Sequence, residues 1–170
     1  MSIFKSVLLL ISIFTSFSSH AVEAINTFNK SGGFFSGPSR SKDKLAILGY
    51  DPVAYFNFTD EKGALRKGSP TPGNDNFTFK YQDALWKFSN QTNLDKFKTN
   101  PQKYAPQYGG YCAFGVAKDD LVKIEPEQYT IINDKLYLNF DRKVNEIWLK
   151  DKEKFIKEAD AKFSNLVNKK

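Results

Sequence analysis

The chain has 170 residues, of which 41% are hydrophobic and 15% aromatic, and its formal net charge is +6 at pH 7. This length suits one domain with a substantial core, and the aromatic content excludes a largely disordered chain. A single cysteine and a single histidine exclude a disulfide framework and a multi-thiolate metal cluster.

The first 21 residues have the pattern of a signal peptide. Lys5 precedes the apolar run Val7–Phe17, and Ser19-His20-Ala21 fits a small-x-small cleavage site. The run is shorter than a bilayer-spanning helix, which needs roughly 17–25 residues. We therefore expect export to the periplasm or outside the cell, with no stable membrane insertion after cleavage.

Cleavage after Ala21 would remove the histidine and the methionine, since residues 22–170 contain neither. Catalytic pairs that depend on an imidazole are then excluded. The basic charge alternates with acidic residues along Lys150–Lys162, which indicates a solvated surface. No nucleic-acid partner is expected, and any attraction to anionic lipid is weak.

Residues 22–44 are predicted to be a flexible lead-in because residues 25–44 are rich in Gly, Ser and Lys. An apolar segment, Leu45–Phe56, then surrounds a Gly-Tyr-Asp-Pro turn. Two hairpins are predicted from alternating and β-prone residues. The expected strands are Phe77–Tyr81 with Leu85–Phe88, and Gln128–Ile132 with Leu136–Phe140.

Ser89 is expected to cap a short helix that runs to about Lys98, and Pro101 to open a short turn through Tyr104. From Asp141 onward, apolar residues recur on one face, which predicts one long amphipathic helix. The expected fold class is α+β: two small antiparallel hairpins packed with a short helix and a long C-terminal amphipathic helix. No internal repeat beyond the two hairpins is visible.

Three strings carry a resemblance to a known family. They are GYDPVAYF at Gly49–Phe56, the aromatic run from Tyr81 through Trp86-Lys87-Phe88-Ser89 to Asn100-Pro101, and YAPQYGGYCAFGVA at Tyr104–Ala117. Together they resemble the YHS domain family in its stand-alone, exported bacterial form. The resemblance runs from about Leu45 to Phe163, within a predicted domain of residues 45–167.

In shorter YHS domains the resemblance implies metal association through cysteines. Ser89 and Asn93 stand where those thiols would fall in this chain. The chain therefore keeps the pattern of the scaffold and lacks those soft ligands. It also departs from the exported form at Asp83, Glu125 and Tyr129.

Cys112 lies among glycines and aromatic residues, in Gly109-Gly110-Tyr111-Cys112-Ala113-Phe114. It is either a reactive or ligand-binding thiol, or a small buried hydrophobe in an aromatic core. Asp51 precedes Pro52 and either offers a carboxylate to a ligand or caps its own turn. Cys112 and Asp51 are the candidate metal ligands, and a transition metal ion is the candidate cofactor.

The further candidate ligand-binding residues have aromatic or amide side chains. They either line a ligand pocket or belong to an aromatic core in which the tyrosine hydroxyls lie at the rim. They are Tyr50, Tyr55, Trp86, Tyr108, Tyr111 and Asn139. Asn139 is expected to be either a pocket amide or the boundary of the last helix. Tyr104 belongs to the same group of tyrosines.

The sequence favours an exported, non-enzymatic YHS-type binding protein that holds a metal ion or small ligand near Cys112. One alternative is a module that binds an envelope protein through exposed aromatic residues, with Cys112 buried. Another is a redox protein that uses the Cys112 thiol alone.

Overall fold

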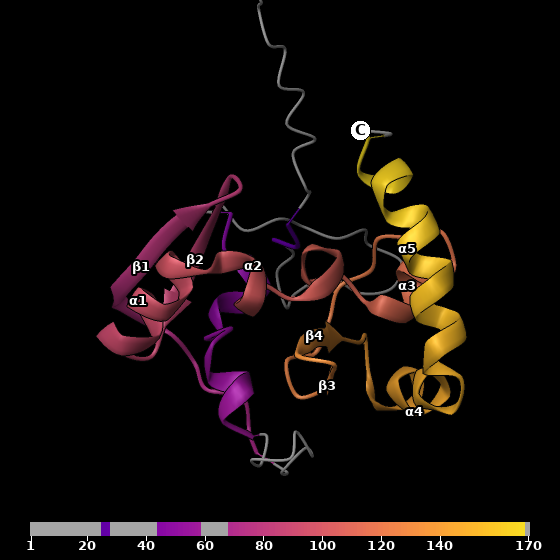
Figure 1. Cartoon of the computed structure of the whole chain (residues 1–170), viewed down its shortest axis with the longest axis horizontal. Coiled ribbons are helices and arrows are strands. Elements are labelled where there is room, and N and C mark those ends of the chain that lie inside the picture. The colour runs from indigo at the N-terminus through magenta and orange to yellow at the C-terminus, as the bar shows by residue number, and fades with distance from the viewer. Residues whose placement is uncertain (1–24, 28–43, 59–67, 169–170) are drawn as a thin grey trace, which may run out of the picture.

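The computed structural model describes residues 25–27, 44–58 and 68–168, and it confirms the α+β class. Two antiparallel hairpins are joined and flanked by helices (Figure 1). In chain order the elements are η1 (Ala46–Gly49), η2 (Ala54–Phe58), β1 (Asn74–Tyr81), β2 (Ala84–Phe88), α1 (Gln91–Thr99), α2 (Pro101–Tyr104), η3 (Gln107–Gly110), α3 (Ala113–Ala117), β3 (Tyr129–Ile132), β4 (Lys135–Leu138), α4 (Arg142–Lys150) and α5 (Lys152–Asn168). The predicted signal peptide lies outside the described residues.

The first hairpin, β1 and β2, turns at Gln82 and Asp83, which both have positive φ angles, 48° and 57°. Two consecutive left-handed residues give a turn whose twist matches that of the strands. One face of this hairpin packs on α1 through Phe97, whose ring lies 5.1 Å from those of Trp86 and Phe88. Asn90, and not the expected Ser89, caps α1 by accepting a hydrogen bond from the Asn93 N–H.

The second hairpin, β3 and β4, turns in the same way at Asn133 and Asp134, with φ angles of 50° and 57°. The sequence predicted both hairpins, and the structure places the ends of their strands within three residues of the expected positions. The alternation of buried and half-buried residues along β2 shows the pattern that made the first hairpin recognisable.

The prediction of one helix from Asp141 onward is wrong. The Asp141 carboxylate caps α4 by accepting from the Val144 N–H, and the helix ends at Asp151, whose backbone leaves the helical region at φ −146° and ψ 49°. A second helix, α5, follows and packs on α3 through Phe155 and Ala159. No helix in the part of the chain that the structure describes is long and apolar enough to cross a membrane.

Two left-handed turns stand before the two hairpins. The first has φ angles of 39°, 58° and 79° at Ile47, Leu48 and Gly49, and the second has 55°, 60° and 81° at Tyr108, Gly109 and Gly110. Non-glycine residues rarely adopt this conformation, so each turn depends on the packing around it. A tyrosine follows each turn, and the next side chain, Asp51 or Cys112, caps a short helical segment.

The two halves of the domain therefore repeat one order of elements. A left-handed turn, a short helix, a hairpin and a nine-residue helix form η1-η2-β1-β2-α1 in the first half and η3-α3-β3-β4-α4 in the second. The residues that end α1 and α4, Asn100 and Asp151, have φ angles of −147° and −146°. From the sequence, only the two hairpins could be recognised as repeated; the repeated turns and helices could not.

Asn26 joins the two left-handed turns. Its backbone N–H donates to the Gly109 carbonyl at 2.7 Å, its side-chain amide donates to the Gly110 carbonyl at 2.8 Å, and its own carbonyl accepts from the Ile47 N–H at 3.1 Å. Ile25, Asn26 and Thr27 are buried. These three residues of the predicted lead-in are part of the packed domain, whereas residues 22–24 and 28–43 lie outside the described residues.

Replacement of Gly110 by alanine tests the second turn. The φ of +81° disfavours any side chain, and an added Cβ would lie 2.6 Å from the Ile47 Cγ2 atom. Because strain and overpacking add, we expect Gly110→Ala to lower the free energy of unfolding by about 2–4 kcal/mol, measured by urea denaturation. Lys157→Ala on the exposed side of α5 is the control; equal stability of the two variants would contradict this view of the turn.

Candidate functional site

The Asp51 carboxylate is fully buried at the start of η2. Its Oδ1 atom accepts from the Val53 N–H at 2.9 Å and from the Ala54 N–H at 3.2 Å. The side chain therefore caps its own turn, as an aspartate before proline commonly does.

The other oxygen of Asp51, Oδ2, joins this turn to the start of α1. It accepts from the Ser89 N–H at 2.8 Å, from the Ser89 hydroxyl at 2.7 Å and from the Asn93 amide at 2.7 Å. Ser89 and Asn93 are the residues at the positions where the YHS resemblance places thiols. Here they supply donors to a carboxylate, and the five hydrogen bonds compensate its burial.

Cys112 is 1% exposed and occupies the corresponding position in the second half. Its Sγ atom accepts from the Gly115 N–H at 3.4 Å, and the thiol donates to the Asn139 Oδ1 atom at 3.6 Å. Asn139 is also buried; it accepts from the Phe114 N–H and donates to the Asn145 side chain at 3.0 Å. Asn139 thus holds the thiol in place, and Asp141 begins the last helices instead.

The pKa of the Cys112 thiol is raised from its ordinary value of 9.0 to about 11. Burial is the largest cause, and the hydrogen bond from the Gly115 backbone offsets it only in part. Metal ligation and nucleophilic attack both require the thiolate. At neutral pH this site therefore favours the neutral, unreactive thiol.

The aromatic candidates have different environments. Tyr55 is fully buried, and its hydroxyl donates to the Pro126 carbonyl at 3.1 Å. The Trp86 indole N–H donates to the Tyr81 carbonyl at 3.1 Å, and Tyr111 is also fully buried. Tyr50 is half-buried beside Pro72.

The residues predicted to share one site are thus found in separate places in the structure. Asp51 lies with Ser89 and Asn93, whereas Cys112 lies with Asn139. Within the described ranges, no three His, Cys, Asp or Glu side chains are grouped so that they could hold a metal ion. A neutral thiol and a carboxylate whose oxygens already accept five hydrogen bonds do not fit a transition metal.

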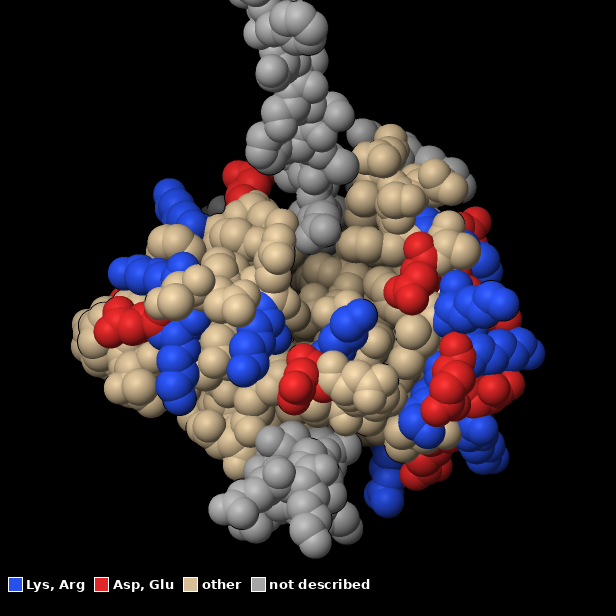
Figure 2. Space-filling model, in the orientation of Figure 1, with Lys and Arg blue, Asp and Glu red and all other residues tan. Residues whose placement is uncertain are grey.

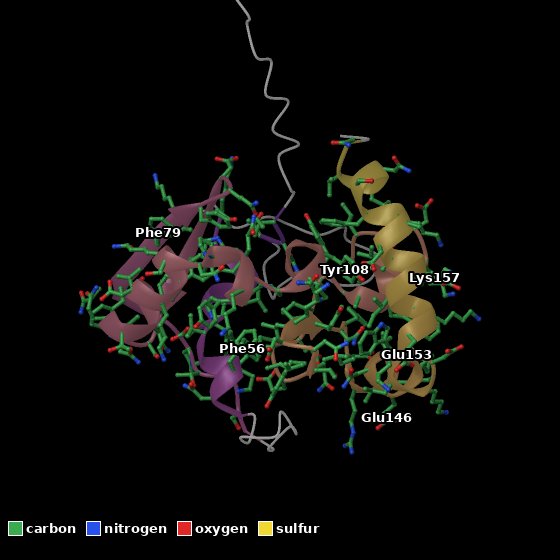
Figure 3. All side chains as sticks on the ribbon, viewed as in Figure 1. Phe56, Phe79, Tyr108, Glu146, Glu153 and Lys157 are labelled. Carbon is green, nitrogen blue, oxygen red and sulfur yellow. The ribbon has the colours of Figure 1, made fainter. Side chains whose placement is uncertain are left out.

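Tyr108, one of the candidate residues, borders a cavity, which we call the Tyr108 cavity. The cavity has a volume of about 420 Å³ and lies between the α2–η3 segment and α5. Figure 2 shows a hollow on this face at the position where Figure 3 labels Tyr108. The rings of Tyr81, Tyr108 and Phe163 and the side chain of Ile25 form its apolar part.

The polar part of the Tyr108 cavity is formed by amides, one carboxylate and the Ser164 side chain. The amides belong to Gln82, Gln102 and Gln107, and the carboxylate to Asp160 on α5. The Tyr108 hydroxyl lies 2.9 Å from the Asp160 Oδ1 atom and donates to it. Burial, followed by this hydrogen bond, raises the pKa of Tyr108, so the hydroxyl remains a donor at neutral pH.

The sequence indicated Tyr108 but none of the residues with amide, carboxylate or serine side chains that line the cavity. They come from the first hairpin, the α2–η3 segment and α5, which only the tertiary structure brings together. Asp160 follows the buried Ala159 on α5 and therefore borders the apolar face of the helix. This position is the one signal in the sequence that could have indicated it.

Comparisons with family models, with curated proteins and with solved structures gave no match to this chain. The relation to YHS domains stays a prediction from the three sequence strings.

Asp51→Asn tests the buried carboxylate. An amide in place of either oxygen would direct N–H groups at existing donors, so at least two hydrogen bonds are lost. We expect a decrease of about 3 kcal/mol or more in the free energy of unfolding, measured by urea denaturation. Asp95→Asn, at an exposed position of α1, should change it by less than about 0.5 kcal/mol; similar losses in both variants would refute the special role of Asp51.

The thiol gives a second prediction. Because the folded-state pKa is raised, the unfolded chain loses the thiol proton first as the pH rises. The contribution of Cys112 to stability is therefore complete below pH 9.0 and decreases up to about pH 11. We expect Cys112→Ala to show a shallower alkaline loss of stability than the wild type in urea titrations.

Labelling provides an independent check of the same thiol. We expect a soluble disulfide reagent at pH 8 to leave Cys112 unmodified in the folded protein and to modify it fully in denaturant. Rapid labelling without denaturant would contradict the buried, neutral thiol.

Proposed function

We propose that this chain is an exported binding protein without a catalytic step of its own, and that its ligand is a small molecule held in the Tyr108 cavity. The observation that carries the proposal is the cavity itself, in which aromatic rings, amides and a hydrogen-bonded carboxylate converge. Export is the expectation from the first 21 residues.

The dimensions of the cavity support this function. A volume of about 420 Å³ falls in the range of roughly 300–1,000 Å³ found for small-molecule sites. The cavity is partly open to solvent and its lining is more polar than apolar, so a ligand would stay partly exposed. Tyr108 belongs to the lining, and its hydroxyl donates to Asp160, which holds that carboxylate at the cavity.

The backbone at Tyr108 also supports the proposal. Its φ of 55° is in the left-handed region, which disfavours a bulky residue. Such strain persists where surrounding contacts compensate it, and it is concentrated at functional positions. Here the hydrogen bonds of Asn26 to Gly109 and Gly110 hold the rest of the turn in place.

Cys112 is assigned a structural role in this proposal. Its burial and raised pKa oppose the redox alternative, which needs an accessible thiolate. The interaction-module alternative shares the buried thiol but also needs exposed aromatic residues. Among the described residues, the exposed large hydrophobic side chains are Ile147 and Leu149, both aliphatic and both on α4.

NMR titration of the labelled protein tests the proposed site. The probes are phenethylammonium, 2-phenylethanol and 3-phenylpropionate, which share a phenyl ring and differ in charge. We expect at least one probe to shift the amide resonances of Gln102, Gln107 and Ser164, all of which border the cavity.

Ser164→Trp provides the matched blocking variant. Ser164 is exposed on α5, so the indole should enter the cavity without disturbing the core. The shifts should disappear in this variant and persist in Lys157→Ala. Probes that shift no cavity resonance, or that bind equally well to Ser164→Trp, would overturn the proposed function.

A further inference from the structure

The charge of the Tyr108 cavity indicates what kind of molecule it binds. Asp160 is the one charged residue among the described residues that line it, and no lysine or arginine is among them. The formal net charge of the whole chain is nevertheless +6. A cavity with the opposite sign to that of its protein favours a cationic ligand.

We infer that the ligand is an organic cation, a primary ammonium group attached to an apolar or aromatic body. This inference rests on the proposed function, because it names the ligand class of the same cavity. In this arrangement the ammonium group contacts the Asp160 carboxylate, and the apolar body lies against Tyr81 and Phe163.

Asp160 is available for such a contact. It forms no ion pair with a lysine or arginine in the described parts of the chain, whereas neighbouring acidic side chains do: Glu158 pairs with Lys118, and Glu153 with Lys152. Its Oδ1 atom accepts from Tyr108, and Oδ2 is the oxygen that would contact the ammonium group. Lys157, one turn earlier on α5, lies on the side of the helix remote from Tyr108 (Figure 3).

The remaining lining suits the same ligand class. An ammonium group has three N–H donors and no acceptor, and the side chains of Gln102 and Gln107 have carbonyl oxygens that can accept from it. The carboxylate and the amide oxygens thus favour a cation over an anion of the same shape, and the rings accommodate its apolar body.

The three probes named above share a phenyl ring and differ in charge, so their relative affinities test the ligand class independently of whether the cavity is a binding site. For the wild type we expect phenethylammonium to bind most tightly, 2-phenylethanol about fivefold more weakly, and 3-phenylpropionate most weakly. The readout is the dissociation constant from NMR titration at low salt, with shifts that map to the cavity.

Two aspartate variants complete the test. Asp160→Asn keeps the size of the side chain and removes its charge, so phenethylammonium should bind about fivefold more weakly while 2-phenylethanol is unaffected. Asp134→Asn is the control, because it removes one charge in the exposed β3–β4 turn, where asparagine tolerates the φ of 57°. It should leave all three affinities unchanged.

The outcomes distinguish the two proposals. If 2-phenylethanol or 3-phenylpropionate binds the cavity as tightly as phenethylammonium, the cation inference is overturned and the proposed function stands. The same holds if Asp160→Asn leaves phenethylammonium binding unchanged. If none of the probes binds at the cavity, the proposed function fails and the inference fails with it.

Discussion

The left-handed turn at Tyr108, Gly109 and Gly110 is the constraint on which both the fold and the proposed site depend. It ends in the buried Tyr111 and places Cys112 at the start of α3, and it directs the hydroxyl of Tyr108 toward Asp160 on α5. The turn leaves no room for a side chain at Gly110, because Ile47 of the first left-handed turn lies against it. The conformation of this turn thus sets both the contact between the two halves of the domain and the position of Tyr108 in the wall of the cavity.

In both halves, the side chain that follows the tyrosine after the left-handed turn caps a short helical segment, but the two side chains differ in chemistry. In the first, the residue after Gly49-Tyr50 is an aspartate, and burial of its charge requires five donors. In the second, the corresponding residue is a cysteine, which packs as a small neutral group and needs only Gly115 and Asn139. The two residues that the sequence offers as metal ligands are, in this account, the two residues that start these short helical segments.

Local patterns in the sequence predicted much of the fold. Residue alternation and the Asn133-Asp134 pair were sufficient for the hairpins, because a two-residue turn and a half-buried strand are local properties. The break at Asp151 was not visible, since the apolar residues on both sides of it continue a single helical face. The prediction of Ser89 as the cap of α1 was wrong, because Asp51, far away in the chain, engages the Ser89 hydroxyl and Asn90 caps the helix instead.

The site was predictable only in part, for the same physical reason. Tyr108 could be singled out from its position in a glycine-rich aromatic run, but Gln82 and Asp160 join it only after α5 packs across α3 and the first hairpin closes. Asn26 shows the same limit, because a segment rich in Gly, Ser and Lys gave no sign that one of its residues pairs with both left-handed turns.

The most direct test of the central claim is native mass spectrometry of the protein isolated from its own compartment, with Cys112→Ala and Asp160→Asn prepared in parallel. We expect a small molecule retained by the wild type to be retained by Cys112→Ala as well and to be lost or depleted in Asp160→Asn. A bound species that disappears in Cys112→Ala and persists in Asp160→Asn would contradict a site in the Tyr108 cavity and would indicate that the ligand binds at the Cys112 thiol.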